Sequence, residues 1–231
     1  MAGLEIYNNN GVMIFDGVRA PLVLQDKITI NGSQAAQQII GTGVNQSTYY
    51  LVNVWVSSPT SVIAMQGGPA SWAIWRRSGT MVTLVTTNNF SSNVMTIYSF
   101  GVSPPVRRNY GLELYDVNGN VIFTSNDKPL KPFSSSELNV MTSNRLLTVN
   151  VGSRPTAVVQ NNKYAYIWNH REATNTFADT MMAMMSVWNG VVAADGFQIR
   201  RIRRGGSTTP IDDPYQPLKR GSITLIDVTN Y

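Results

Sequence analysis

An internal repeat constrains the fold of this chain more than any other feature of its sequence. Residues 3–22, GLEIYNNNGVMIFDGVRAPL, align without a gap with residues 111–130, GLELYDVNGNVIFTSNDKPL, at an offset of 108. Ten of the 20 columns are identical, whereas chance would give about one or two. Because Asn-Gly hairpins are common, convergence is an alternative, but the number of identities favours internal duplication.

Each copy of the repeat has the pattern of a β-hairpin. A short segment alternates apolar and polar residues, an Asn-Gly pair follows at 10–11 or 118–119, and a second apolar segment comes next. Asn and Gly both tolerate the positive φ angles that a two-residue hairpin turn requires. We therefore predict that a hairpin opens each half of the chain.

A weaker similarity continues beyond the two hairpins. Trp75 and Trp188 are 113 residues apart, each after a β-branched residue, and residues 95–98 resemble residues 223–226. The growing offset predicts an insertion near 205–220, where glycine and proline residues indicate a loop.

The seam between the halves contains Pro104-Pro105, which disfavours helix and inner strand alike. We therefore predict a first domain over 1–103, a Pro/Arg linker over 104–110 and a second domain over 111–231.

The remaining sequence favours strands. Short β-rich segments are separated by turn residues, and 175–188 fits a helix or a strand, with the alignment of its Trp188 favouring strand. The predicted class is all-β: two tandem antiparallel β-sandwich domains with jelly-roll or Greek-key connections, related by internal duplication. Whether the repeats form separate domains or one pseudo-symmetric sandwich stays open at this point. The segments predicted as strands are Thr48–Val56, Ser71–Arg76, Thr80–Thr86, Val94–Val102, Leu146–Val151, Tyr164–Trp168, Phe197–Ile202 and Ser222–Val228.

Composition excludes several classes of site. The chain has no cysteine and one histidine, which excludes disulfides, thiolate catalysis and multi-histidine metal sites. Charged residues make up 13%, about half the usual share of roughly 25%. No signal peptide or long apolar run is visible, and we expect synthesis in the cytoplasm without membrane insertion.

The candidates for catalysis are isolated residues. Asp212 and Asp213 are adjacent in a Pro-rich stretch, and such side chains usually point apart. Glu5 and Glu113 recur in both copies, which favours a structural role, and His170 is expected in a loop after a strand. We predict no catalytic residues, no cofactor and no metal, and hence no enzyme.

The strongest charge feature is a basic cluster, Arg200, Arg201, Arg203 and Arg204, in a chain of net charge +5. It fits a contact with an acidic partner subunit, a contact with nucleic acid or an anionic sugar, or an edge strand protected by charge from stray pairing. We expect a partner contact and regard nucleic acid as the less favoured ligand.

Two further sets of residues allow two interpretations each. Met181, Met182, Met184 and Met185 suit an adaptable contact surface or the filling of a core. Several aromatic residues could stack on sugars or belong to the core: Tyr49, Tyr50, Trp72 and Tyr166.

The repeated block G-L-E-[IL]-Y-x-x-N-G-x-x-I-F, with Pro-Leu shortly after it, resembles the opening of small tail proteins of tailed bacteriophages. Residues 3–16 match that opening and residues 111–124 match it again, except that Thr124 stands where Asp is expected. The close match covers about 30 residues. The resemblance implies a virion component and supplies no catalytic residues.

The expected function is therefore that of a structural virion protein, in the tail tip or fibre-attachment region. Its expected partners are copies of itself, neighbouring virion proteins and a host-surface receptor. The alternatives are a capsid decoration or cement protein, and a cell-surface carbohydrate-binding module.

Overall fold

The fold is described from a computed structural model. The residues that the structure describes are 6–7, 13–15, 21–31, 36–40, 47–67, 71–86, 94–102, 111–116, 118–138, 145–162, 165–172, 175–206, 215–219 and 221–231.

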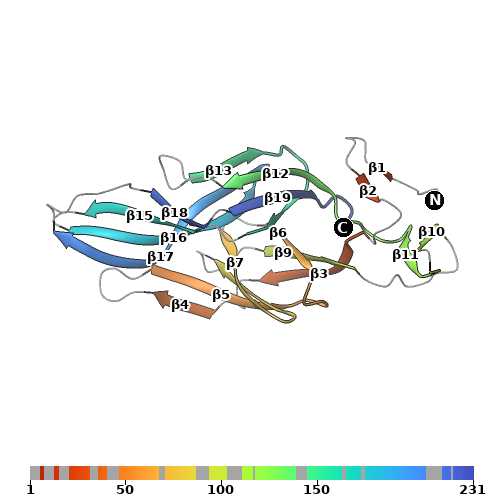
Figure 1. Ribbon diagram of the computed structural model, residues 1–231, viewed down its shortest axis with the longest axis horizontal. Coiled ribbons are helices and arrows are strands. Elements are labelled where there is room, and N and C mark those ends of the chain that lie inside the picture. Colours follow the sequence, from red (N-terminus) through yellow and green to blue (C-terminus); the bar gives the residue numbers. More distant parts are fainter. Residues whose placement is uncertain are drawn as a thin grey trace.

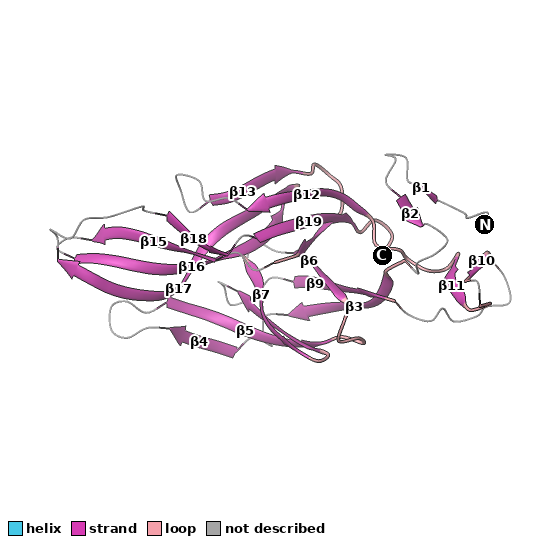
Figure 2. Ribbon diagram, in the orientation of Figure 1, coloured by secondary structure: helices cyan, strands magenta, loops and turns pink. Residues whose placement is uncertain are grey.

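Within these residues every regular element is a β-strand (Figure 2). The strands are β1 (Ile6–Tyr7), β2 (Met13–Phe15), β3 (Val23–Asn31), β4 (Ala36–Ile40), β5 (Ser47–Trp55), β6 (Val62–Gly67), β7 (Trp72–Ser78), β8 (Met81–Thr86), β9 (Val94–Gly101), β10 (Glu113–Tyr115), β11 (Val121–Thr124), β12 (Pro132–Leu138), β13 (Arg145–Asn150), β14 (Thr156–Gln160), β15 (Ala165–Glu172), β16 (Asn175–Trp188), β17 (Val191–Gly206), β18 (Tyr215–Lys219) and β19 (Gly221–Asp227).

Two large antiparallel sheets form the body of the molecule (Figure 1). One has six strands in the order β12-β19-β14-β6-β9-β3. The other has nine, in the order β13-β17-β16-β7-β8-β5-β4, with β15 on β16 and β18 on β15. The predicted class, an all-β fold of antiparallel sheets packed as a sandwich, is confirmed.

The two halves of the chain contribute matching sets of strands to both sheets. In the six-stranded sheet, the first half contributes strands in the spatial order β3-β9-β6, and the second half contributes strands in the matching order β12-β19-β14. In the nine-stranded sheet, β5, β8 and β7 correspond in the same way to β13, β17 and β16. The halves meet where Met65 pairs with Val158 in one sheet and Trp72 pairs with Met185 in the other.

One hydrophobic core lies between the sheets and draws on both halves. Alternate residues of each strand point to the same face, and the inward-facing residues of the two sheets form a single buried cluster. Of the two arrangements left open by the sequence, the pairing is that of one shared sandwich. The boundary at 104–110 therefore divides the sequence repeat and not the sheets, and that linker lies outside the described residues. Core residues from both halves include Ile30, Val54, Met65, Trp72, Leu84, Ile97, Leu138, Leu146, Val158, Met185, Val192, Ile223 and Leu225.

The repeated segments form two small hairpins with the same register. Ile6 pairs with Phe15 in the β1–β2 hairpin, and Leu114 pairs with Phe123 in the β10–β11 hairpin, 108 residues later. Each hairpin has a register shift at the same place, directly before Tyr7 or Tyr115. The hairpin predicted at the start of each half is confirmed in both copies, while the duplication itself stays a prediction.

The Pro-Leu ends of the two repeats lie against each other. The Leu130 amide donates to the Leu22 carbonyl at 2.7 Å, and the Leu24 amide donates to the Lys128 carbonyl at 2.8 Å. Both leucines pack on a second apolar cluster, which includes Phe100 and covers the outer face of the six-stranded sheet. The identical closing residues of the repeat therefore join the two halves to each other.

Two expectations about individual segments need revision, and a third is confirmed. His170 lies inside β15, opposite Phe177, and not in a loop. Part of the segment predicted as a loop over 205–220 is strand, because β17 continues to Gly206 and β18 covers Tyr215–Lys219. The segment 175–188 is a strand, as the alignment of Trp188 favoured, and its four methionines are buried, which supports core filling over a contact surface.

Candidate interaction surfaces

The two hairpins and the ends of the longest strands lie at opposite ends of the molecule (Figure 1). The hairpins are separate two-stranded sheets beside the C-terminus. At the other end, β16 and β17 extend past the sandwich and pair there with β15 and with each other. Both ends are candidates for contacts with partners.

The β10–β11 hairpin exposes apolar side chains. Leu112 is 56% exposed and Tyr115 is 50% exposed. The apolar residues of its strands are only partly buried, and these are Leu114, Val121, Ile122 and Phe123. Because two-stranded hairpins are marginally stable in water, a surface of this kind gains stability when another element covers it.

The turn of this hairpin is held by Asp116. Its carboxylate accepts hydrogen bonds from the Asn118 amide at 2.8 Å, the Asn120 amide at 2.8 Å and the Asn120 side chain at 2.9 Å. The hydrogen bonds from Asn120, and then those from Asn118 and Gly119, hold the pKa of Asp116 below its ordinary value. Gly119 has φ +80°, the conformation that favours glycine in this turn.

The connection that follows the hairpin is fixed by two contacts. The Asp127 carboxylate accepts the Thr124 amide at 2.7 Å within the turn after β11, and the hydroxyl of Tyr231 donates to the carbonyl of Pro129 in this connection. The Glu113 carboxylate accepts the Tyr115 hydroxyl at 2.5 Å, which agrees with the structural role expected for this residue. The hairpin is thus preorganised while its apolar residues stay accessible.

The four arginines predicted as partner contacts lie together on the far part of β17. Three of them lie opposite residues of β16: Arg200 opposite Thr180, Arg201 opposite Asp179 and Arg203 opposite Phe177. Arg204 is the next residue of β17. Asp179 is 1% exposed and accepts a hydrogen bond from Gln198 at 3.3 Å. The cluster therefore lies on a paired strand that has a buried carboxylate on its neighbour. Its side chains are outside the described residues.

Two of the four aromatic residues suggested for sugar stacking are buried. Tyr49 is 8% exposed and Trp72 is fully buried, which rules out stacking on their faces in this structure. Tyr50 is partly exposed, and the side chain of Tyr166 is outside the described residues. Among the tryptophans whose side chains the structure describes, the exposed ones are Trp55, at 65%, and Trp188, at 53%.

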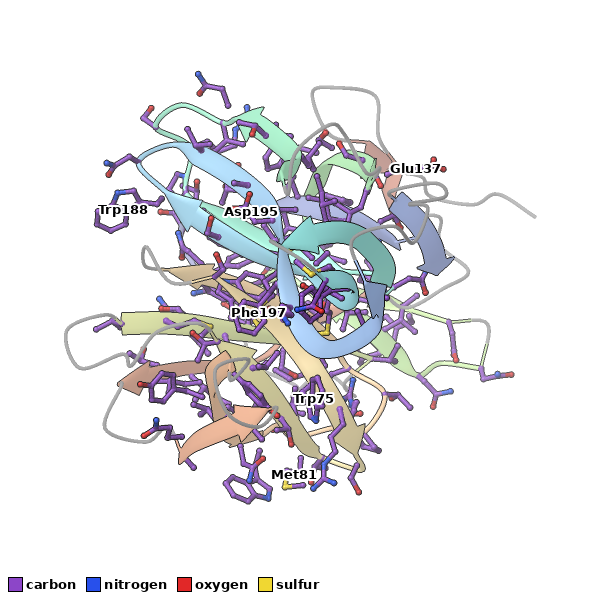
Figure 3. All side chains as sticks on the ribbon, turned by 90° about the vertical axis from the view of Figure 1, so that its left-hand side faces the viewer. Trp75, Met81, Glu137, Trp188, Asp195 and Phe197 are labelled. Atoms are coloured by element: carbon purple, nitrogen blue, oxygen red, sulfur yellow. The ribbon has the colours of Figure 1, made fainter. Side chains whose placement is uncertain are left out.

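Trp188 lies at a site that the sequence reasoning missed. It precedes Asn189-Gly190, which joins β16 to β17 with φ angles of 49° and 75°. This is the same Asn-Gly signal that identified the two repeated hairpins, and it could have located this turn. Figure 3 shows the Trp188 side chain at the edge of the molecule, pointing away from the ribbon.

Among the described residues, no group of three or more acidic or histidine side chains is placed to bind a metal ion. No helix suited to crossing a membrane is found among those residues. Asp212 and Asp213 lie outside the described residues.

Comparison of the chain with protein-family models, with curated proteins and with solved structures finds no match.

Proposed function

We propose that this protein is a structural component of a tailed-bacteriophage particle, in the tail tip or fibre-attachment region, that acts through protein–protein contacts. The observation that carries the proposal is the pair of hairpins, built from the repeated motif and placed at one end of the sandwich (Figure 1). The β10–β11 hairpin presents Leu112 and Tyr115 to solvent. Apolar residues on a preorganised surface are suited to assembly with other subunits.

The sandwich suits a structural role in a particle. It has a single core, and both hairpins lie at the same end of it. We propose a second contact at the other end of the molecule, where the arginine cluster lies in β17 and its charge would suit an acidic neighbour. A protein with contacts at both ends can link two neighbours in an assembly. The proposed partners are copies of this chain and adjacent virion proteins, with a host-surface receptor at whichever end faces outward.

Gold-labelled antibody electron microscopy on purified virus particles from the source tests the proposal. We expect label at the tail end. Label over the head would replace the tail assignment with capsid decoration or cement. Absence of label on intact particles, with label on the purified protein as the positive control, would contradict both virion assignments.

A further inference from the structure

An open groove lies at the turns of the second half, at a place where the first half is closed. In both halves, the turn of a hairpin in the nine-stranded sheet is hydrogen-bonded to the neighbouring connection between the sheets. Val56 donates to the Thr80 carbonyl at 2.9 Å in the first half, and Val151 donates to the Gly190 carbonyl at 2.8 Å in the second. The two sites therefore have the same framework.

Arg77 fills this place in the first half. Its guanidinium donates to the Ser61 carbonyl at 2.5 Å, the Ser58 carbonyl at 2.7 Å and the Ser61 hydroxyl at 3.0 Å. It also donates to the Gly79 carbonyl at 3.4 Å. These bonds join the β7–β8 turn to the connection between β5 and β6.

The second half has no residue in the position of Arg77, because its hairpin is shorter. Trp72 of β7 pairs with Met185 of β16, and this contact gives a common starting point for counting residue pairs along the two hairpins. At the same number of pairs from it, the first half has Arg76 opposite Thr83 and the second half has Trp188 opposite Val191. The β7–β8 hairpin continues for two more pairs, which include Arg77. The β16–β17 hairpin turns at once through Asn189-Gly190.

The place left open is a groove of about 390 Å³, here called the Trp188 groove. Its volume lies within the roughly 300–1,000 Å³ of small-molecule sites. Beside the half-exposed indole of Trp188, its lining carries neutral hydrogen-bonding side chains and one charged side chain, Arg154. The neutral polar lining residues are Gln66, Ser153, Thr156 and Asn189.

Several contacts give the groove a defined shape. The Gln66 amide oxygen accepts the Tyr98 hydroxyl at 2.7 Å, which orients this side chain. The Arg154 guanidinium lies 4.5 Å from the centre of the Phe133 ring, so part of the cation is engaged with an aromatic face. Gly152 and Gly190 touch so closely that a Cβ on Gly190 would lie 2.3 Å from the Gly152 carbonyl oxygen.

We propose that the Trp188 groove binds a neutral sugar ring. A pyranose has an apolar face of C–H groups, which fits the flat face of an indole, and a rim of hydroxyls that pair with amide and hydroxyl groups. A polyanion is less suited, because such ligands are bound by clusters of cations and the lining contains one. The sugar would be held by Trp188 beneath the ring and by Gln66, Ser153 and Asn189 at its edge.

Saturation-transfer NMR with the full-length protein and four soluble probes tests this proposal. The probes are glucose, galactose, N-acetylglucosamine and the anionic glucuronate. We expect at least one neutral probe to bind, and a Trp188→Ala variant to bind it about tenfold more weakly, a change of ~1.4 kcal/mol. Trp55→Ala is the matched control, because it removes another exposed tryptophan that does not line the groove, and its affinity should equal that of the native protein.

A second variant closes the groove without removing the indole. Ser153→Arg places a long side chain at an exposed position of the lining, by analogy with Arg77 in the first half, and should abolish binding while the circular dichroism spectrum stays native. The proposal is overturned if no neutral probe binds, if glucuronate binds and the neutral sugars do not, or if Trp188→Ala and Trp55→Ala bind alike. None of these outcomes depends on where the protein lies in a particle.

Discussion

Glycine has different roles in the turns of two corresponding hairpins, β7–β8 and β16–β17. Gly79 has φ +57° and open space where a Cβ would lie, whereas Gly190 has φ +75° and the Gly152 backbone in that place. Gly79→Ala should lower the free energy of unfolding by about 1 kcal/mol, from backbone strain alone. Gly190→Ala should lower it by about 3 kcal/mol, because the strain is joined by a clash between backbones. Urea unfolding of both variants checks this difference, and equal losses would contradict the close contact of the two turns.

Tyr231 links the C-terminus to stability at alkaline pH. Burial, and then the negative charge of Asp227, raises the pKa of Tyr231 well above its ordinary value of 10.0. Above pH 10 the unfolded chain loses this proton while the folded chain keeps it, and so the free energy of unfolding falls as pH rises. Below pH 10 the contribution is fully present.

The variant Tyr231→Phe should therefore flatten the fall in stability above pH 10. At neutral pH it should cost about 1 kcal/mol, because the hydrogen bond to the Pro129 carbonyl is lost. Tyr98, whose pKa is also raised by burial, provides the comparison as Tyr98→Phe. Urea titrations from pH 7 to pH 11 measure the slopes, and an unchanged slope in Tyr231→Phe would show that this group does not titrate with unfolding.

The burial of single residues was the least predictable feature. Tyr49 and Trp72 were candidates for sugar stacking or for the core, and both are buried. Trp72 lies in the central core, and Tyr49 lies in an apolar cluster on the outer face of the nine-stranded sheet, together with Met184 and Val85. Strands of this chain are apolar on both faces, so alternation of residue types cannot tell which side chains face solvent. The exposure of Trp188 follows from the position of a turn, which has a sequence signal.

At the scale of elements, the β10–β11 hairpin should act in assembly and not in folding. The double variant Leu112→Ser, Tyr115→Ser removes the two exposed apolar side chains of this hairpin. Exposed substitutions change the free energy of unfolding by at most about 0.5 kcal/mol, so the folded protein should persist. The amount of the variant in purified particles should fall severalfold, as measured by quantitative immunoblotting.

The control for this experiment is the double variant Trp55→Ser, Val94→Ser. Both residues are exposed on the sandwich, at 65% and 53%. This variant should enter particles as the native protein does. Equal incorporation of the two double variants would contradict an assembly role for the hairpin.

The strands that sequence reasoning located have strong local signals, but several that it missed, such as β3, β6 and β14, are also rich in β-branched residues. Runs rich in β-branched and aromatic residues, such as β5 and β8, were predicted to within one or two residues at each end. β12, with the sequence PFSSSEL, was not predicted, because its polar composition gives no strand pattern. It is a strand because it pairs along its length with β19, a contact between segments about 90 residues apart. Such pairing is set by tertiary structure and leaves no local trace.

At the scale of the whole molecule, the repeat predicted two similar halves but not how they join. Nothing local in β6 or β14 indicates that they pair with each other, and the same is true of β7 and β16. The result is two continuous sheets and one core in which neither half buries its apolar face alone. We therefore expect each half to depend on the other for folding. The Pro-rich boundary in the sequence instead suggested two domains.

The most direct test of this shared sandwich is cleavage between the halves. A specific protease site inserted between Arg107 and Arg108 allows the folded protein to be cut once, and size-exclusion chromatography then shows whether the pieces stay together. We predict that the fragments elute at the volume of the intact chain, retain its circular dichroism spectrum and separate only in denaturant. Two fragments that elute separately, each with native β-sheet signal, would contradict the shared core and restore two independent domains.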